Sequence, residues 1–222
     1  MARLWVVKSA VFAALMAFFL TMYQGAQAQS LVNGSFASGN LAGWTVFTTS
    51  GGTNGIYGGY PQVASFNVTG GGAQNAALFN VGSGGGGITQ DITFAKSETF
   101  SFSADFASTS VSNNADGGTF DLLVDNNIVA SDAVGFIGVG DTVRGSLSTS
   151  GGLSAGQHVF GMEITRAYGS GGVDSTPSQY VTNFTLTPAA APEASTLVGF
   201  ATGITFLGVM MAWRRRKPAQ PA

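Results

Sequence analysis

The chain has 222 residues, of which 45% are hydrophobic and only 9% are charged, so it holds one domain of ordinary size plus targeting segments but not two large domains. It contains no cysteine, which excludes disulfides and thiolate metal sites. Residues 29–192 carry three Lys or Arg against ten Asp or Glu, a net charge of −7, and such an acidic domain repels phosphates, so no nucleic-acid partner is expected.

Residues 1–28 have the three parts of a secretory signal peptide. Two basic residues precede an apolar stretch, and Ala26 and Ala28 occupy the small positions of a small-x-small cleavage site. We therefore expect an N-terminal signal helix that is removed after Ala28, with the rest of the chain working outside the cytoplasm. The alternative is an N-terminal anchor that is retained.

The segment that follows opens with Leu-Val-Asn-Gly-Ser-Phe at 31–36 and then Gly43-Trp44, and it closes with Tyr-Val-Thr-Asn-Phe-Thr-Leu at 180–186. These two motifs resemble the first and last strands of jelly-roll carbohydrate-binding modules and galactose-binding-like domains. Thr182 stands where those domains commonly have aspartate. The resemblance implies that the two ends of the domain lie near each other and that Trp44 belongs to the core.

Aromatic residues that could stack on a sugar are found in Gly-rich stretches. Tyr57 and Tyr60 lie among glycines at 55–60, and Tyr168 lies beside Gly169. An exposed aromatic ring can pack against the apolar face of a sugar, so these three tyrosines are the candidate ligand-binding residues. The alternative for each of them is packing within the domain.

Short runs of alternating polarity, separated by Gly, Asn and Ser, fill residues 29–187. For example, Phe100, Phe102 and Phe106 fall on one face of a strand, with Ser101 and Ser103 on the other. The same alternation occurs in four more runs: Ile88, Ile92 and Phe94; Phe120, Leu122 and Val124; Phe160, Met162 and Ile164; and Tyr180, Phe184 and Leu186. Such strands need a second apolar layer, and no convincing amphipathic helix is present. The sequence therefore predicts an all-β, jelly-roll-like antiparallel β-sandwich.

Two turn regions are also predicted within this domain. Asp125-Asn126-Asn127 is typical of a hairpin turn, and residues 82–87, which include four consecutive glycines, are typical of a mobile loop.

Few residues of the domain could carry chemistry. His158 is the only histidine and shares its face with core residues, which favours a structural role and argues against a Ser-His-Asp triad. Paired carboxylates could serve a glycosidase, and the candidates are Asp105, Asp121, Asp125 and Glu163. Solvation on the polar faces of strands is the simpler interpretation of these carboxylates, so we expect no catalytic residues and no enzyme.

No organic cofactor is expected. Oxygen ligands favour calcium over zinc or iron, and the stretch formed by Asn113, Asn114, Ala115 and Asp116 is the candidate for a structural calcium site. A solvated turn is the alternative that we favour there.

The C-terminal region predicts a membrane segment. Residues 197–213 carry no charge and would span about 25 Å as a helix, near the lower limit for crossing a bilayer. Arg214, Arg215, Arg216 and Lys217 follow at once, and such a basic cluster stays on the cytoplasmic side. The domain before the helix therefore faces outward.

The order of Pro192-Glu193-Ala194, a short apolar helix and a basic end resembles the PEP-CTERM sorting tail of Gram-negative bacteria. That family has Pro-Glu-Pro, so Ala194 departs from its motif. The resemblance implies a membrane protease of the exosortase type as partner, a single-pass membrane intermediate, and delivery to the cell surface or extracellular matrix. Whether the altered motif is processed stays open.

We divide the chain into a signal peptide (1–28), a β-sandwich domain (29–187), a linker with the sorting motif (188–196), a transmembrane helix (197–213) and a basic cytoplasmic tail (214–222). The expected function is that of an exported, surface-sorted, non-enzymatic protein that binds polysaccharide. The alternatives are a purely structural matrix protein without a specific ligand and a carbohydrate-active hydrolase.

Overall fold

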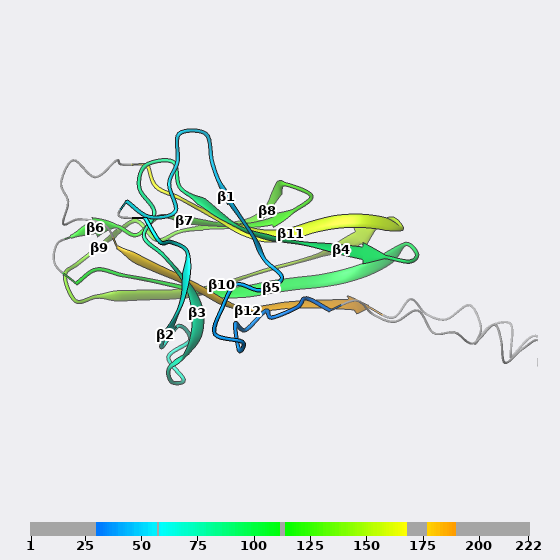
Figure 1. Ribbon diagram of the computed structural model, residues 1–222, viewed down its shortest axis with the longest axis horizontal. Helices are drawn as coiled ribbons and strands as arrows, with labels where there is room; N and C mark the ends of the chain where they lie inside the picture. The colour runs from blue at the N-terminus through cyan, green and yellow to red at the C-terminus, as the bar shows by residue number, and fades with distance from the viewer. Residues whose placement is uncertain (1–29, 57, 112–113, 168–176, 190–222) are drawn as a thin grey trace, which may run out of the picture.

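The computed structural model describes residues 30–56, 58–111, 114–167 and 177–189, and these residues form an all-β structure of two facing antiparallel sheets (Figure 1). The predicted signal peptide, sorting motif, transmembrane helix and basic tail lie outside the described residues. No helix suited to crossing a bilayer is found in the part of the chain that is described.

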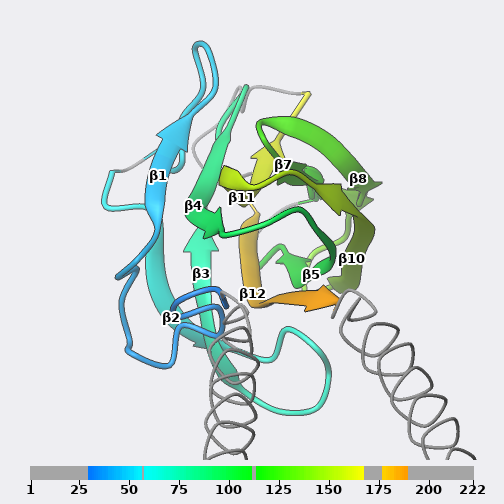
Figure 2. The same ribbon diagram turned by 90° about the vertical axis from the view of Figure 1, so that its right-hand side faces the viewer.

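Each main sheet has five strands, and all neighbours are antiparallel (Figure 2). In spatial order, the first sheet contains β1 (Thr45–Thr48), β4 (Gly86–Phe94), β11 (Gly156–Thr165), β7 (Thr119–Val124) and β8 (Asn127–Ala133). The second contains β10 (Thr142–Leu153), β5 (Glu98–Thr109), β12 (Ser178–Ala189), β3 (Gln74–Phe79) and β2 (Gln62–Phe66). A small third ladder pairs β6 (Ala115–Asp116) with β9 (Phe136–Ile137). β12 thus continues two residues into the predicted linker.

Aromatic rings fill the space between the two sheets. The ring of Phe160 on β11 lies 5.6 Å from that of Phe100 and 5.1 Å from that of Phe102, both on β5 of the opposite sheet. Phe106 of β5 stacks on Phe120 of β7 with 4.3 Å between the ring centroids. The predicted alternation of β4, β5, β7 and β11 is therefore confirmed, because the apolar residues of each strand lie in this core.

The two ends of the domain pack against each other, as the motifs at 31–44 and 180–186 imply. The indole of Trp44 lies 4.5 Å from the ring of Phe184 on β12, and Phe36 contacts both rings. The backbone N–H of Phe184 also donates to the carbonyl of Gly34 at 3.0 Å. The opening segment thus closes one side of the core.

The predicted core-facing residues of β12 are wrong at the start of the strand, where Tyr180 was expected to face the core. A register shift after Thr182, where Asn183 adopts a φ of 54°, interrupts the alternation. As a result Val181, and not Tyr180, is fully buried in the core beside Phe184. Tyr180 lies on the outer face and stacks on Phe66 at 3.9 Å. A β-bulge shifts every later side chain to the opposite face, which strict period-two counting cannot anticipate.

The predicted hairpin turn is confirmed. Asp125 and Asn126 have φ values of 52° and 60° between β7 and β8, the left-handed pair of a two-residue type I′ turn. Asn127 already pairs with Val124, so it belongs to the strand.

The predicted loop at 82–87 is shorter than expected, because residues 82–85 lie outside any strand but Gly86 and Gly87 do not. Gly86 and Gly87 are buried and begin β4 between β1 and β11. A Cβ atom at Gly85 would lie 1.9 Å from the carbonyl oxygen of Ile164, and one at Gly87 would lie 2.0 Å from that of Met162. The glycines are needed because neighbouring backbone approaches them closely.

We expect Trp44→Ala to lower the free energy of unfolding by about 3–5 kcal/mol, because it removes the ring that joins Phe36 and Phe184 and leaves a cavity. Urea unfolding of the β-sandwich domain measures this change. Val46→Ala is the matched control, since Val46 is 43% exposed and its loss should cost no more than about 0.5 kcal/mol. Equal shifts for the two variants would contradict the assignment of Trp44 to the core.

Candidate ligand-binding site

A row of five residues, one from each strand, crosses the outer face of the first sheet. In order they are Phe47 on β1, Gly87 on β4, Glu163 on β11, Asp121 on β7 and Ser131 on β8, each the direct cross-strand partner of the next. Their neighbours Ile88, Met162 and Leu122 point into the core. Because successive side chains of a strand alternate between faces, the cross-strand row projects outward.

The aromatic end of the cross-strand row is Phe47. A Cβ atom at Gly87 would lie 2.8 Å from Cζ of Phe47, so the ring rests on the glycine backbone where no other side chain would fit. Phe47 is half-buried and keeps part of its ring accessible. A ring that packs against a sheet in this way offers an apolar surface at low entropic cost.

The centre of the cross-strand row is a pair of carboxylates. Asp121 and Glu163 are direct partners in the ladder, a position that places Cβ atoms about 4.5–5.5 Å apart. Burial raises the pKa of Glu163, and the neighbouring charge of Asp121 raises it further. Asp121 is only 5% exposed although it faces outward, and no ion pair to either carboxylate is found among the described residues. The half-buried Glu163 therefore presents hydrogen-bond acceptors beside the nearly buried Asp121, and the described residues supply neither carboxylate with a neutralising cation.

A second row runs beside the first and supplies hydroxyl groups. Thr45 of β1 faces Thr89 of β4, and Gly161 of β11 separates Thr89 from Leu123 of β7. Two adjacent rows thus combine an aromatic ring, two carboxylates and two threonines on one sheet face.

The other two candidate carboxylates have structural partners instead. Asp105 accepts a hydrogen bond from the side-chain amide of Asn183 at 2.9 Å, which supports the bulge of β12. Asp125 accepts from the backbone N–H of Val159 at 3.0 Å and contacts His158 at 2.8 Å. The structure therefore brings together Asp121 and Glu163 and leaves Asp105 and Asp125 elsewhere.

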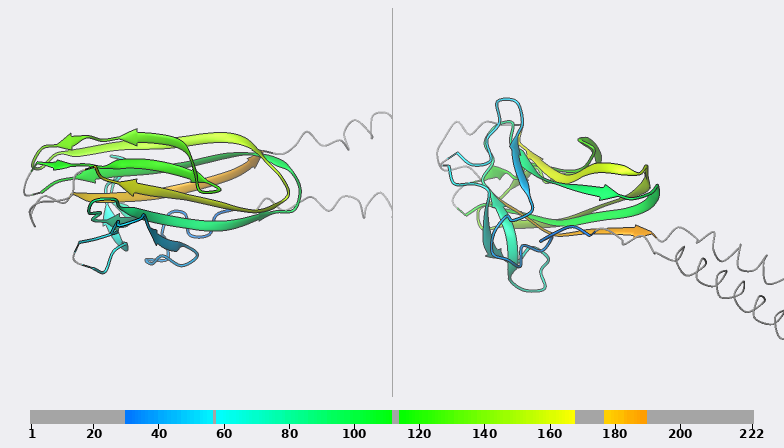
Figure 3. Two further views of the ribbon diagram at one scale, coloured as in Figure 1. Left: turned by 90° about the horizontal axis from the view of Figure 1, so that it is seen from above. Right: turned by 45° about the vertical axis from the view of Figure 1, so that its right-hand side comes forward.

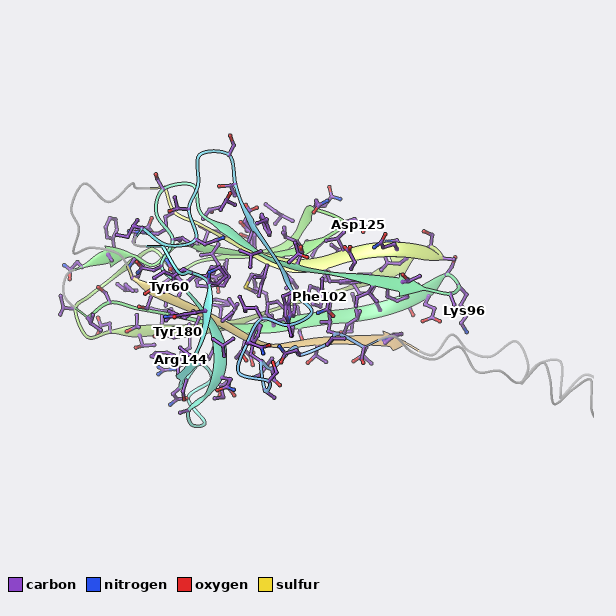
Figure 4. All side chains as sticks on the ribbon, viewed as in Figure 1. Tyr60, Lys96, Phe102, Asp125, Arg144 and Tyr180 are labelled. Atoms are coloured by element: carbon purple, nitrogen blue, oxygen red, sulfur yellow. The ribbon has the colours of Figure 1, made fainter. Side chains whose placement is uncertain are left out.

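The one candidate tyrosine that the structure describes, Tyr60, does not belong to the cross-strand row. Tyr57 and Tyr168 lie outside the described residues. Tyr60 is half-buried and packs over Gly55, where a Cβ atom would lie 2.3 Å from its ring. Figure 4 shows Tyr60 near Tyr180, and burial raises the pKa of the Tyr180 hydroxyl, with a smaller contribution from nearby Tyr60.

The outer face of the second sheet is closed by the chain itself. Nε of Arg144, on the edge strand β10, donates to the carbonyl of Asn67 at 2.9 Å, and Asn67 directly follows β2 at the opposite edge. In a flat five-stranded sheet these edges would lie about 19 Å apart. The sheet therefore curls, and β2 and β3 run across the other strands (Figure 3). Beneath the Arg144 bridge lies a small apolar cluster of Val68, Ala76, Ala107, Phe66 and Tyr180.

His158 has the predicted structural role. Its Nδ1 lies 2.8 Å from Oδ2 of Asp125 and its Nε2 lies 3.1 Å from the carbonyl of Ser154. Both neighbours are acceptors, so both ring nitrogens are best satisfied when they carry protons. The hydrogen bond to Asp125 raises the pKa of His158 most, burial opposes this, and the Ser154 carbonyl adds to the increase.

Residues 113–116 are the candidate calcium site. The part of them that the structure describes, residues 114–116, shows no metal site. Oδ1 of Asp116 accepts from the backbone N–H of Gly118 at 3.0 Å, and the Asp116 charge lies near the buried Arg166 guanidinium, whose pKa is lowered by burial. Asn113 lies outside the described residues. No group of three or more His, Cys, Asp or Glu that could hold a metal occurs among the residues that the structure describes.

The cross-strand row was only partly visible in the sequence. Asp121 and Glu163 were candidates, but their pairing depends on the register of two strands about forty residues apart. Phe47 was missed because the neighbouring pair Val46-Phe47 does not reveal which residue faces outward. Only the glycine opposite Phe47 marks the space for its ring.

Comparison with known proteins gives similar folds at low similarity. No family model and no curated protein matches the chain. Among solved structures, the enzymatically active domain of bacteriophage CBA120 tailspike protein 4 is 16% identical, with a TM-score of 0.44 and coverage of 71% of this chain but only 21% of that one. The carbohydrate-binding module TmCBM61, solved with β-1,4-galactotriose, is 10% identical, with a TM-score of 0.39 and coverage of 72% and 99%.

A third match is the CBM22-1 and GH10 modules of a Clostridium thermocellum xylanase, solved with xylohexaose. It is 14% identical with a TM-score of 0.43, and the match covers 72% of this chain and 28% of the xylanase chain. The chain therefore spans only 21% and 28% of the length of two of these proteins. These similarities assign neither a family nor a ligand.

We expect the contact between His158 and Asp125 to make stability depend on pH near neutrality. The folded-state pKa of His158 lies above its unfolded value of about 6.5, so the stabilisation is fully present below that pH and is lost as the pH rises through the folded-state pKa. Urea unfolding at several pH values measures the loss. Because the chain has no other histidine, His158→Gln should abolish this part of the profile. A single imidazole titration by NMR at or below the unfolded value would contradict the prediction.

Proposed function

We propose that the chain is an exported, non-enzymatic protein that binds polysaccharide through the cross-strand row on the first sheet. The observation that carries this proposal is the half-buried Phe47 ring lying in line with the carboxylates of Glu163 and Asp121. A sugar presents C–H groups on one face and hydroxyls at its rim. The ring packs against the former, and the carboxylates accept hydrogen bonds from the latter.

The negative charge of the cross-strand row determines which class of polysaccharide the proposed site binds. Asp121 and Glu163 have no ion-pair partner among the described residues, so their field repels uronic acids and sulfated sugars. A neutral polysaccharide, which donates hydroxyl hydrogens without a like charge, fits the site better.

The proposed location rests on the sequence of the two ends. The signal peptide with Ala26 and Ala28 supports export, and Pro192-Glu193-Ala194 with the basic cluster at 214–217 supports an exosortase-type protease as partner. On this proposal the chain passes through a single-pass membrane state and then reaches the cell surface or extracellular matrix.

One observation favours a second candidate, a carbohydrate-active hydrolase. Asp121 and Glu163 are cross-strand partners, and retaining glycosidases hold their two carboxyl groups about 5–5.5 Å apart. The raised pKa of Glu163 also suits a general acid. Binding and hydrolysis therefore need to be measured on the same variants.

We expect Phe47→Ala and Glu163→Gln each to weaken binding to a neutral polysaccharide by about 10-fold or more, because each removes one contact of roughly 1.5 kcal/mol. Affinity electrophoresis against a panel of neutral and acidic polysaccharides identifies the ligand, and calorimetry measures the loss. Val46→Ala and Asp132→Asn are matched controls on the same sheet and should bind as the unaltered protein does.

Three results would contradict this proposal or the site that it names. If no polysaccharide in the panel retains the unaltered protein, the structural matrix function is favoured. If the protein releases reducing sugar and Glu163→Gln abolishes that activity while binding remains, the protein is a hydrolase. Loss of binding in Tyr60→Ala but not in Phe47→Ala would move the site to the second sheet.

A further inference from the structure

The four edges of the two main sheets differ in how they are protected. β1 and β2 are short, with 4 and 5 residues. β8 has 7 residues, its pairing with β7 shifts register between Leu122 and Leu123, and it carries Asp132. β10 has 12 residues and pairs with β5 without any register shift. Short length, bulges and charges are the usual means of keeping an edge strand from pairing with another chain, and β10 has the fewest of them.

The composition of β10 also leaves it open to pairing. It consists of Ser, Thr, Gly, Val and Leu apart from Arg144, with no proline and no acidic residue. Arg144 does not protect the edge from pairing with another strand, because its Nε donates a hydrogen bond to the carbonyl of Asn67 over the sheet face. The main-chain groups of β10 that point away from β5 therefore form a long and nearly uncharged template.

Apolar side chains near β10 remain exposed. Val143 at one end of the strand is 38% exposed, and Leu153 at the other end is only partly buried. Figure 2 shows β8 on the same side of the molecule as β10, in the other layer, and Ile128 on β8 is 59% exposed. A partner that pairs with β10 would cover apolar surface as well as backbone groups.

We propose that β10 pairs antiparallel with β10 of a second copy of this chain, across a two-fold axis at Ser148, so that two five-stranded sheets become one continuous sheet. Directly opposed residues must share a sheet face, so even-numbered residues of β10 meet even-numbered ones. An axis at Ser148 then places Ser146 opposite Ser150 and Arg144 opposite Gly152. The one charge of the strand meets a glycine, so no like charges oppose each other.

The same register pairs the apolar ends. It brings Val143 opposite Leu153 of the second copy, and the symmetry repeats this contact at the other end. An isologous interface of this kind closes as a dimer, because each copy uses its own edge and leaves none free there. The dimer leaves the cross-strand row on the first sheet uncovered, so it is independent of the ligand site.

The absence of cysteine allows a direct test with the full chain in detergent. Ser148→Cys places one thiol beside its own symmetry mate, at a separation suited to a disulfide. We expect a mild oxidant to convert most of this variant to a covalent dimer, even on dilution. Ser65→Cys is the control, since Ser65 is also exposed but lies on the short edge β2. Equal cross-linking of the two variants would overturn the proposal, as would cross-linking of Ser148→Cys to a different protein only.

A charge-pair experiment tests the register. In the proposed dimer, residue 146 of each copy faces residue 150 of the other, while the two positions within one chain lie about 13 Å apart. Ser146→Lys with Ser150→Glu should therefore keep the dimer, and Ser146→Lys with Ser150→Lys should dissociate it, as measured by sedimentation. Both variants alter the same exposed positions and keep the same tail. The same oligomeric state for both variants would contradict the proposal.

Discussion

Ring packing between Phe160 of the first sheet and Phe100 and Phe102 of the second is the contact on which the rest of the structure depends. The chain has no disulfide, and the described residues contain no metal cluster, so burial of apolar surface must hold the layers together. Alternate residues of β4, β7 and β11 point into this core, so the residues between them must point outward. The cross-strand row follows from this alternation.

The parts of the fold that sequence could predict are those with local causes. Period-two alternation identified the core faces of β5 and β11, and Asp125-Asn126 identified a turn, because each pattern depends on residues close in the chain. Gly86 and Gly87 were misassigned since a glycine run in a loop and one that admits a neighbouring backbone look alike in sequence. The candidate site depends on register between distant strands, so Glu163 and Asp121 were recognised as carboxylates but not as partners of each other or of Phe47.

The two outer faces of the sandwich differ, because the chain itself covers one of them and leaves the other open. On the second sheet, the bond from Arg144 to Asn67 closes the face over Phe66 and Tyr180, so its aromatic rings serve packing. On the first sheet, Gly87 and Gly161 carry no side chains, which leaves space beside Phe47, Glu163 and Thr89. Aromatic residues alone are therefore a poor guide to a ligand site here, because the stacked rings of Phe66 and Tyr180 lie on the closed side.

β12 has a mechanical consequence for a protein held by its C-terminal end. This last strand lies inside the second sheet, bonded to β5 over most of its length and to β3 at its start. Antiparallel hydrogen bonds run perpendicular to the strand, so a pull at Ala189 loads many of them together in shear. The packing of Phe184 against Trp44 adds resistance near the middle of the strand. A domain attached through this strand would withstand drag from a surface polymer better than one attached through an edge strand, which peels off bond by bond.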